Sequence, residues 1–370
     1  MQTKTRRLVL SLAGMIGAWA LAAVIALELI QPGNGEFALG AESGLTMADT
    51  IGSRLARALV AGINAGVIAA FLEIKVLPRY AKRVGVGVML LARTGVYAAV
   101  ALTSVLAVAR FVAVRELSVS PRELITSEGF REFLRSPEFL KLIVAFVIAS
   151  FFINATIQVA RLLGPGMLRQ ILMGRYVSPV HEDRSFLFVD LADSTAIAEA
   201  LGPLKFAEFK NDFFHDIAEP VLNSRGQIVQ YVGDEVMVTW PAERRGRNSS
   251  ADCVRCLFAL EDQVTDRTEE YKARYGVVPS FRAGLHSGRV VVSQLGDIKR
   301  EVAFSGDAVN TASRIQGLCK ELGHDFLASY DVIDGLELPD AVQAEALGEH
   351  TLRGRTAPVS LLALTRTARS

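Results

Sequence analysis

Two stretches decide the fold of this chain: FLFVDLADSTAIAEALG, residues 186 to 202, and GQIVQYVGDEVMVTW, residues 226 to 240. Phe186 to Val189 is a short apolar run typical of a buried strand, and it ends at Asp190. Two further apolar runs, Gln227 to Val232 and Val236 to Trp240, flank Gly233-Asp234, which predicts two strands joined by a tight turn. Each Asp therefore follows the end of a strand.

The two acids at these strand ends predict a nucleotide site. Neighbouring carboxylates repel each other unless a cation lies between them. Magnesium and manganese prefer oxygen ligands and are commonly held by a few carboxylates together with the phosphates of a nucleotide. The loop after Leu191 leads into an expected helix, and the free N–H groups near Ser194 and Thr195 suit a phosphate group.

Four ordered motifs resemble the catalytic domain of the class III nucleotidyl cyclases, the adenylate and guanylate cyclases. They are FVDLADST (188–195), GDE (233–235), RAGLHSG (282–288) and GDAVNTASRI (306–315). The resemblance covers roughly Glu182 to Thr365, about half of the chain. It implies an α+β ferredoxin-like catalytic domain, assigned to residues 182–370, that works as a head-to-tail homodimer.

The resemblance also implies roles for matched residues. Asp190, Asp234 and the backbone carbonyl of Leu191 are expected to bind two Mg²⁺ or Mn²⁺ ions per site, which activate the ribose 3′ oxygen and hold the triphosphate. Asn310 and Arg314 are spaced i, i+4, so both project from one helix face, and they are expected to stabilise the transition state. A permanently charged, planar donor such as Arg314 suits an oxygen whose negative charge grows during reaction.

The residues expected to select the base depart from the family's pattern. Adenylate cyclases of the family usually carry a Lys four residues before the turn acid and an Asp or Thr before GD-x-VN, where this chain has Gln230 and Ala303. The Gln230 amide can donate and accept, so it can read either purine, whereas Ala303 offers only its backbone. Arg353 stands where the family usually carries a Lys before Gly, and it can clamp a terminal phosphate.

We therefore expect an adenylate cyclase that converts ATP to cyclic AMP and pyrophosphate. A guanylate cyclase is one alternative, favoured by the absent Lys. A catalytically inactive, nucleotide-binding membrane receptor is the other, although the metal-binding and transition-state residues are all present.

The composition narrows the class of protein further. The chain has 40 basic and 39 acidic residues and a net charge of +1, so no overall field points to a nucleic acid partner. Hydrophobic residues make up 51% and the mean hydropathy is +0.31, which is high for a soluble enzyme, and the apolar runs are concentrated in the first half. Three cysteines are too few for a disulfide framework.

The first half predicts a membrane domain over residues 1–163. Four apolar stretches have about the length of a transmembrane helix, at residues 8–30, 55–76, 86–113 and 140–163. The first also fits a signal peptide. Lys and Arg cluster before the first stretch, between the second and third, and after the fourth, so both termini and the catalytic domain are expected in the cytoplasm, with membrane lipid as a partner.

Some polar residues lie within these stretches. Glu73 and Arg93 fall near helix ends, where snorkelling or a mutual ion pair is expected. Asn154 and Gln158, spaced i, i+4, are expected to bind neighbouring helices together. Residues 164–181 form the linker, which either transmits a signal from an unknown membrane ligand or partner protein, or is a passive spacer.

The catalytic half alternates expected helices and strands. Helices are predicted at 195–219, 249–275 and 308–322, and strands at 280–287, 289–295 and 361–365. Asp193 is expected to cap the first helix, Glu235 to stabilise the turn, and His286 to be structural. Residues at helical spacing in the first helix are expected in the core: Phe206, Phe209, Phe213, Phe214 and Ile217.

Overall fold

The computed structural model divides the chain into two compact units, Met1–Leu162 and Leu163–Ser370, which are described separately. The residues that the structure describes are 13–14, 16–25, 37–38, 46–47, 51–73, 86–117, 122, 126, 128–163, 174–241, 249–297, 301–336, 338–339, 341–355 and 357–367. The predicted linker falls largely outside these residues, as do the N-terminal basic cluster and the loop between the second and third apolar stretches.

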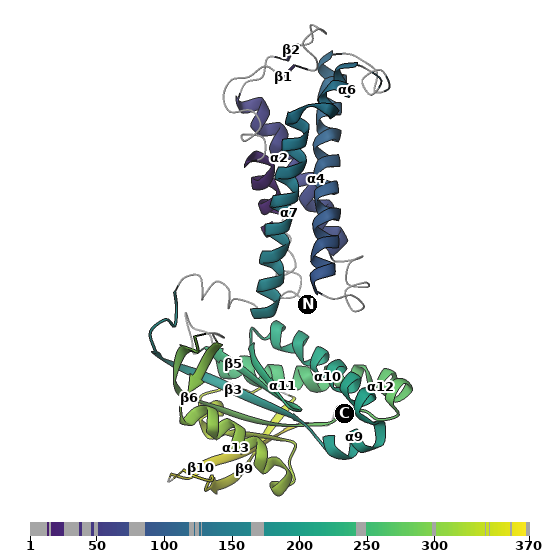
Figure 1. The fold of residues 1–370 in the computed structure, drawn as a ribbon. Coiled ribbons are helices and arrows are strands. Elements are labelled where there is room, and N and C mark those ends of the chain that lie inside the picture. The colour runs from purple at the N-terminus through teal and green to yellow at the C-terminus, as the bar shows by residue number, and fades with distance from the viewer. Residues whose placement is uncertain are drawn as a thin grey trace. The chain divides into compact units, whose positions relative to one another are not determined.

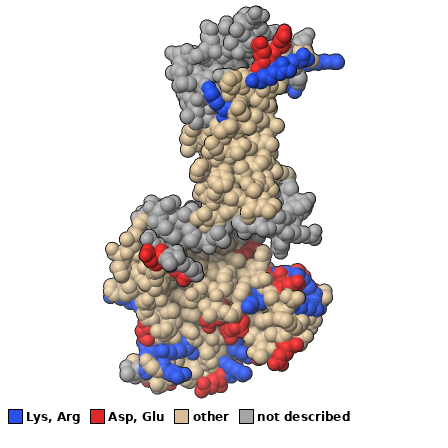
Figure 2. Space-filling view, viewed as in Figure 1, with Lys and Arg blue, Asp and Glu red and all other residues tan. Residues whose placement is uncertain are grey.

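The first unit is helical (Figure 1). Two of its helices contain apolar stretches long enough to cross a membrane, Gly87–Val108 and Phe139–Val159, whereas Ile16–Ile25 and Leu55–Phe71 are shorter. On the face seen in Figure 2, most of this unit's described surface carries no charged side chain. The elements are α2 (Ile51–Phe71), α4 (Val86–Leu117), α6 (Glu128–Arg135), α7 (Pro137–Leu163) and the antiparallel pair β1 (Phe37–Ala38) and β2 (Thr46–Met47).

Several polar side chains of this unit have partners inside it. Glu73 and Arg93 form the expected ion pair, at 3.4 Å, and Tyr97 donates a hydrogen bond to Glu73. The Asn154 amide is buried and donates to the Ser150 carbonyl, at 2.9 Å, one turn earlier in α7. The Asn154 amide thus bonds to its own helix, and the bond expected between helices stays a prediction.

The second unit is built on one large sheet with the strand order β4-β5-β3-β6-β8-β10-β9. β7 pairs with the C-terminal part of β6, residues 291–295. β6 and β8 are parallel, whereas the other neighbouring strands are antiparallel. The strands are β3 (Val180–Leu191), β4 (Gln227–Val232), β5 (Glu235–Pro241), β6 (Phe281–Leu295), β7 (Glu301–Ser305), β8 (Phe326–Ser329), β9 (Val342–His350) and β10 (Val359–Arg366).

The ferredoxin-like core is confirmed by the chain order β3-α10-β4-β5-α11-β6, in which four antiparallel strands alternate with two helices. One sheet face packs on α10 (Pro203–Asn223) and α11 (Ser249–Asp266), and α13 (Asp307–Leu322) covers the other (Figure 1). The first face buries Phe209, Phe213 and Ile217, and Phe206 and Phe214 pack partly buried against them. These five residues therefore lie in or against the core, as their spacing predicts.

Several predicted elements are divided or joined differently. The helix predicted at 195–219 is two helices, α9 (Ser194–Leu201) and α10, because Gly202 adopts φ 73° and Pro203 begins the second helix. The helix predicted at 249–275 is also two, α11 and α12 (Thr268–Tyr275). The strands predicted at 280–287 and 289–295 are one strand, since Gly288 lies inside the β3 ladder opposite Arg184.

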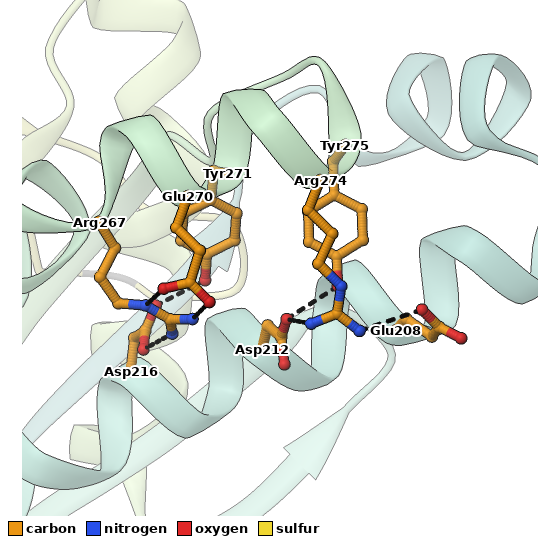
Figure 3. A network of polar contacts seen from close by, with 8 residues as sticks. All are labelled: Glu208, Asp212, Asp216, Arg267, Glu270, Tyr271, Arg274 and Tyr275. Atoms are coloured by element: carbon orange, nitrogen blue, oxygen red, sulfur yellow. Dashed lines mark hydrogen bonds and ion pairs between the residues drawn. The ribbon is translucent and has the colours of Figure 1, made fainter.

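Helix α12 is tied to α10 by buried and half-buried polar contacts (Figure 3). The Asp216 carboxylate, only 3% exposed, accepts a hydrogen bond from Tyr271 at 2.6 Å and forms an ion pair with Arg267. One turn away, Asp212 accepts from Tyr275 at 2.8 Å and pairs with Arg274. Two carboxylates of α10 thus hold the short helix α12 in place.

Candidate active site

The centre of the candidate site is a group of carboxylates at one end of β3. Asp190 is the last but one residue of β3, and in the ladders it lies opposite Glu235 of β5 and Arg282 of β6. Asp234 occupies the turn between β4 and β5, directly before Glu235, and Gly233 makes that turn with φ 61°. The structure therefore places Asp190 beside Asp234, as the sequence predicts.

Burial and nearby negative charge disfavour the charged forms of Asp190 and Glu235. Burial, followed by the charge of Asp234, raises the pKa of Asp190, while a hydrogen bond from Gln316 and the charge of Arg282 oppose that rise. Burial, followed by the charges of Asp190 and Asp234, raises the pKa of Glu235 to about 7. The negative charge here is only partly compensated by the protein.

This donor set fits a divalent cation. Excess negative charge on half-buried carboxylates is relieved by a bound cation, and carboxylate oxygens are the ligands that Mg²⁺ and Mn²⁺ prefer. Among the described residues, no group of three His, Cys, Asp or Glu side chains is arranged to hold a metal ion. A cation at Asp190 and Asp234 would therefore take further oxygen ligands from elsewhere, such as the Leu191 backbone or a phosphate.

The loop after β3 turns sharply into α9. Asp193 adopts a left-handed conformation, with φ 53°, at the N-cap position of α9, but its side chain makes no capping hydrogen bond. Its carboxylate instead lies 3.9 Å from the Arg282 guanidinium, so the expected capping role is wrong. Ser194 and Thr195 are the first two residues of α9, where the backbone N–H groups lack helical partners.

Helix α13 carries Asn310 and Arg314 on a face that points away from the sheet. Ala308, Ala312 and Gln316 are buried against the sheet at intervals of four residues. Asn310 is exposed and Arg314 half-buried. Because each residue turns an α-helix by about 100°, a residue two positions from the buried row lies roughly opposite to it.

The other face of α13 reaches the carboxylates. Gln316 hydrogen-bonds to Asp190, and the helix backbone at Gln316 packs directly on Gly284 of β6. One helix thus presents Gln316 to the carboxylate group and Asn310 with Arg314 to the opposite side. Nothing in the described contacts brings Asn310 or Arg314 to Asp190 within one chain.

Arg314 lies beside the loop that precedes β10. Its guanidinium would be 3.5 Å from a Cβ atom added at Gly354, and Arg355 in the same loop pairs with Asp307 at 3.2 Å. Arg353 is exposed in this loop. Within the part of the chain that the structure describes, one buried nitrogen of Arg314 and one of Arg355 have no hydrogen-bond partner, so both can donate to an added anion.

The two positions expected at the base lie on different strands. Gln230 is exposed on β4, the strand at the sheet edge, next to an irregularity in the β4–β5 ladder between Ile228 and Gln230. Ala303 lies in β7, opposite Ser293 of β6. No printed contact joins the two residues in one chain.

Sequence reasoning missed Arg282 and Gln316, which both contact or face Asp190. A signal for Gln316 was present, because it is the polar member of an otherwise small and apolar row on the buried face of α13. His286 is buried, and its Nδ1 lies 2.7 Å from the Ser329 hydroxyl, in keeping with the expected structural role.

The comparison with protein families decides the relationship. A sequence model of the adenylate and guanylate cyclase catalytic domain matches residues 176–361, about half of the chain. The chain belongs to this cyclase family. β3 of the cyclase domain begins at Val180, slightly before the domain start expected at residue 182.

Individual relatives are similar over about half of the chain. Adenylate cyclase 2 of Rhizobium meliloti (strain 1021) is 41% identical over 209 residues, which are 56% of this chain and 57% of that protein. Adenylate cyclase 1 of the same organism is 30% identical, over 47% of this chain and 26% of that protein. The chain thus spans about half the length of the first relative and about a quarter of the second.

Among solved structures, the adenylyl cyclase CyaB from P. aeruginosa is similar at 18% identity and a TM-score of 0.45. The match covers 52% of this chain and 98% of that chain.

Proposed function

We propose that the chain is a membrane-anchored adenylate cyclase that converts ATP to cyclic AMP and pyrophosphate. The observation that carries this proposal is the position of Asp190 beside Asp234 at the end of β3, in a domain of the cyclase family. In the reaction the ribose 3′ oxygen bonds to the α-phosphorus, the bond from that phosphorus to the β-phosphate oxygen breaks, and pyrophosphate leaves.

Adenine is the base we favour. The two relatives described above, at 41% and 30% identity, are both named adenylate cyclases. Gln230 can supply both a donor and an acceptor to the purine edge, and Ala303 leaves the second contact to its backbone. The same departure from the family's usual Lys favours guanylate cyclase as the second candidate.

Divalent cations, two per site, would be held by the Asp190 and Asp234 carboxylates and the Leu191 carbonyl. When bound, they activate the ribose 3′ oxygen and neutralise the leaving pyrophosphate. The N–H groups at Ser194 and Thr195 would hold phosphate oxygens at the start of α9.

On the opposite side of the nucleotide, Asn310 would orient the ribose and Arg314 would donate to the α-phosphate oxygens as their charge grows. Arg353 would bind the terminal phosphate. The buried Arg314 nitrogen that has no hydrogen-bond partner among the described residues supports this assignment, since it is a ready donor.

The arrangement on α13 supports a homodimer. Gln316 faces Asp190 of its own chain, and Asn310 and Arg314 point to the opposite side of the helix, so one chain cannot bring both sets of groups to one nucleotide. A second copy, related by a two-fold axis, would supply Asn310 and Arg314 to the carboxylates of the first and receive the same in return.

The helical unit would anchor the enzyme in a membrane as a multi-pass domain, with both termini and the catalytic unit in the cytoplasm. The two long apolar helices support membrane association. The two shorter apolar helices, Ile16–Ile25 and Leu55–Phe71, would complete four spans if they extend into neighbouring residues. Its stimulus would be a membrane ligand or a partner protein.

The test is product formation by the full-length protein in membranes with Mn²⁺ and either ATP or GTP. We expect cyclic AMP from ATP, and none from an Asp234→Ala variant of equal abundance. Cyclic GMP as the main product would show that the second candidate, a guanylate cyclase, is correct instead. No cyclic nucleotide from either substrate would overturn it.

A further inference from the structure

Arg184 is a buried arginine on the face of β3 that packs against β7 and α13. It is 2% exposed and lies in the alternating row that also contains Phe186 and Phe188, which belong to the core on that face. Its three guanidinium nitrogens reach three different residues: Nε donates to Glu182 at 2.9 Å, Nη2 to the Tyr176 hydroxyl at 3.3 Å, and Nη1 to Gln227 at 3.4 Å. One side chain thus joins three parts of the fold.

Glu182 completes this group. Its carboxylate, 13% exposed, accepts hydrogen bonds from Arg175 at 2.7 Å and from the Tyr176 hydroxyl at 3.1 Å as well as from Arg184. We call Arg175, Tyr176, Glu182, Arg184 and Gln227 the Arg184 cluster. Burial opposes the charge of Glu182, but Arg184 and the other donors outweigh it and lower the pKa of this carboxyl.

The cluster fixes the segment that leads into β3. Tyr176 is 3% exposed, adopts φ 73°, and packs in the same core as Phe186 and Val292. Its backbone carbonyl accepts a hydrogen bond from the Gln294 N–H of β6 at 2.9 Å. Both the side chain and the backbone of this residue are therefore held against the sheet.

The cluster also touches the two strands that carry the expected base-reading positions. Gln227 begins β4, three residues before Gln230, a distance of about 10 Å along an extended strand. The Arg184 guanidinium carbon lies 4.7 Å from the ring centre of Phe304, which is the neighbour of Ala303 on β7. The Arg184 side chain thus contacts both strands directly.

We propose that Arg184 is a positioning residue that fixes β4 and β7 relative to β3 and thereby sets where Gln230 and Ala303 meet the purine. The inference rests on the proposed function, because it concerns recognition of the same nucleotide. Arg184 would therefore affect substrate affinity and base preference without touching the reacting atoms.

Stability alone does not account for this arginine. Burying a charge carries a large desolvation cost, and a buried ion pair replaced by apolar groups of similar volume often leaves a protein equally or more stable. Phe186 and Phe188 follow Arg184 in the row and the Phe304 ring lies against it, so an apolar side chain would suit this part of the face. What an apolar residue lacks is a set of directional bonds to β4, to the leading segment and to Glu182.

The test compares Arg184→Met, which keeps the length of the stem and removes the donors, with Arg184→Lys and with Arg289→Met. Arg289 is a matched control, because it lies on the same sheet in an exposed ion pair with Asp183 at 3.4 Å. Full-length proteins in membranes would be assayed for kcat and KM with ATP and with GTP, and equilibrium binding of a fluorescent ATP analogue with Mn²⁺ would be measured in parallel.

We expect Arg184→Met to raise KM and the dissociation constant for ATP about tenfold, because Gln230 and Ala303 are no longer held in place. The difference in affinity between ATP and GTP should decrease. The kcat of this variant should change by less than about threefold, because the transition-state groups remain. Arg184→Lys should recover part of the affinity, and Arg289→Met should match the wild type.

Distinct outcomes separate this inference from the proposed function. If the wild type is active and the folded Arg184→Met variant has the same KM, ATP affinity and base preference, the inference is overturned and the proposed function is not. Loss of kcat in proportion to loss of folded protein, at constant KM, also overturns it, since that is the result of a purely structural role. A wild type that neither binds nor cyclises ATP or GTP overturns the proposed function and the inference with it.

Discussion

Substitution of Gly284 by alanine should separate α13 from the sheet. Gly284 lies in β6 directly under this helix, and a Cβ atom there would meet the Ala312 carbonyl oxygen and the Gln316 Cα atom, both at 2.7 Å. Ordinary contacts of this kind are about 3.5 Å long, so these two contacts alone require the helix to move by roughly 0.8 Å, and the still closer backbone nitrogen of Gln316 requires more. All the clashing atoms belong to the helix backbone, which cannot rotate aside.

The cost should be at the upper end of the usual range for overpacking, about 3 kcal/mol. For a unit of this size, 1 kcal/mol lowers the melting temperature by about 2–4 °C, so the expected decrease is roughly 6–12 °C. Activity should fall as well, because Gln316 is displaced from Asp190, whose carboxylate it contacts. The melting temperature and the metal-dependent activity are therefore coupled through one helix.

Thermal unfolding can be followed by tryptophan fluorescence, since Trp240 is buried in the catalytic unit and Trp19 is the only other tryptophan of the chain. Gly317→Ala is the matched control. Gly317 is exposed on the same helix with nothing within 4 Å of an added Cβ, so alanine there should be neutral or stabilise by up to about 1 kcal/mol. A Gly284→Ala protein that melts within about 2 °C of the wild type would refute the close packing of α13 on β6.

Three further predictions concern other parts of the catalytic unit. Asp216→Ala should lower the free energy of unfolding by about 3 kcal/mol in urea titrations, because it leaves buried donors unpaired, whereas the exposed Glu269→Ala should change it by less than about 0.5 kcal/mol. Burial lowers the pKa of His286 to about 4, below its value of about 6.5 in the unfolded chain, so the unfolded state binds the extra proton. Stability should therefore fall by about 3 kcal/mol as the pH drops from 6.5 to 4, and His286→Gln should remove most of that dependence. Arg314→Ala should lower kcat about a hundredfold at unchanged protein abundance, and a decrease of only a few-fold would contradict its assigned role.

Local patterns predicted the parts of the fold that depend on neighbours in sequence. The turn at Gly233-Asp234, the helix at 308–322 and the last strand all lie where periodicity and turn residues placed them. The sequence also contains the break between α9 and α10, as Gly202-Pro203, but the Ala-rich run before it and the helical spacing of the Phe residues after it obscured the break. Gly288 led to the opposite error, a strand break that does not exist. Glycine often ends a strand, but here it lies inside β6 and makes room for Ala308 of α13.

Long-range contacts were beyond the reach of such patterns. Arg184 and Gln227 are 43 residues apart and meet only because β4, β5 and β3 are neighbours in the sheet. The strand predicted from the sequence began at Phe186, which left Arg184 outside it and without a partner. The separation of Asn310 from Asp190 likewise required the packing of α13 on β6, which decides which face of the helix is covered.

In the proposed homodimer, the two faces of α13 would give each chain only half of each active site. If Asp190 and Arg314 act together only across two chains, a chain that lacks one and a chain that lacks the other are both inactive, yet a mixed pair contains one complete site. Random association makes half of the pairs mixed, each with one of two sites intact, so a mixture of two dead proteins would recover about a quarter of the wild-type activity. Activity would then be proportional to the number of paired chains rather than to the total number of chains. When association is weak, the activity would rise with the square of the chain density in the membrane.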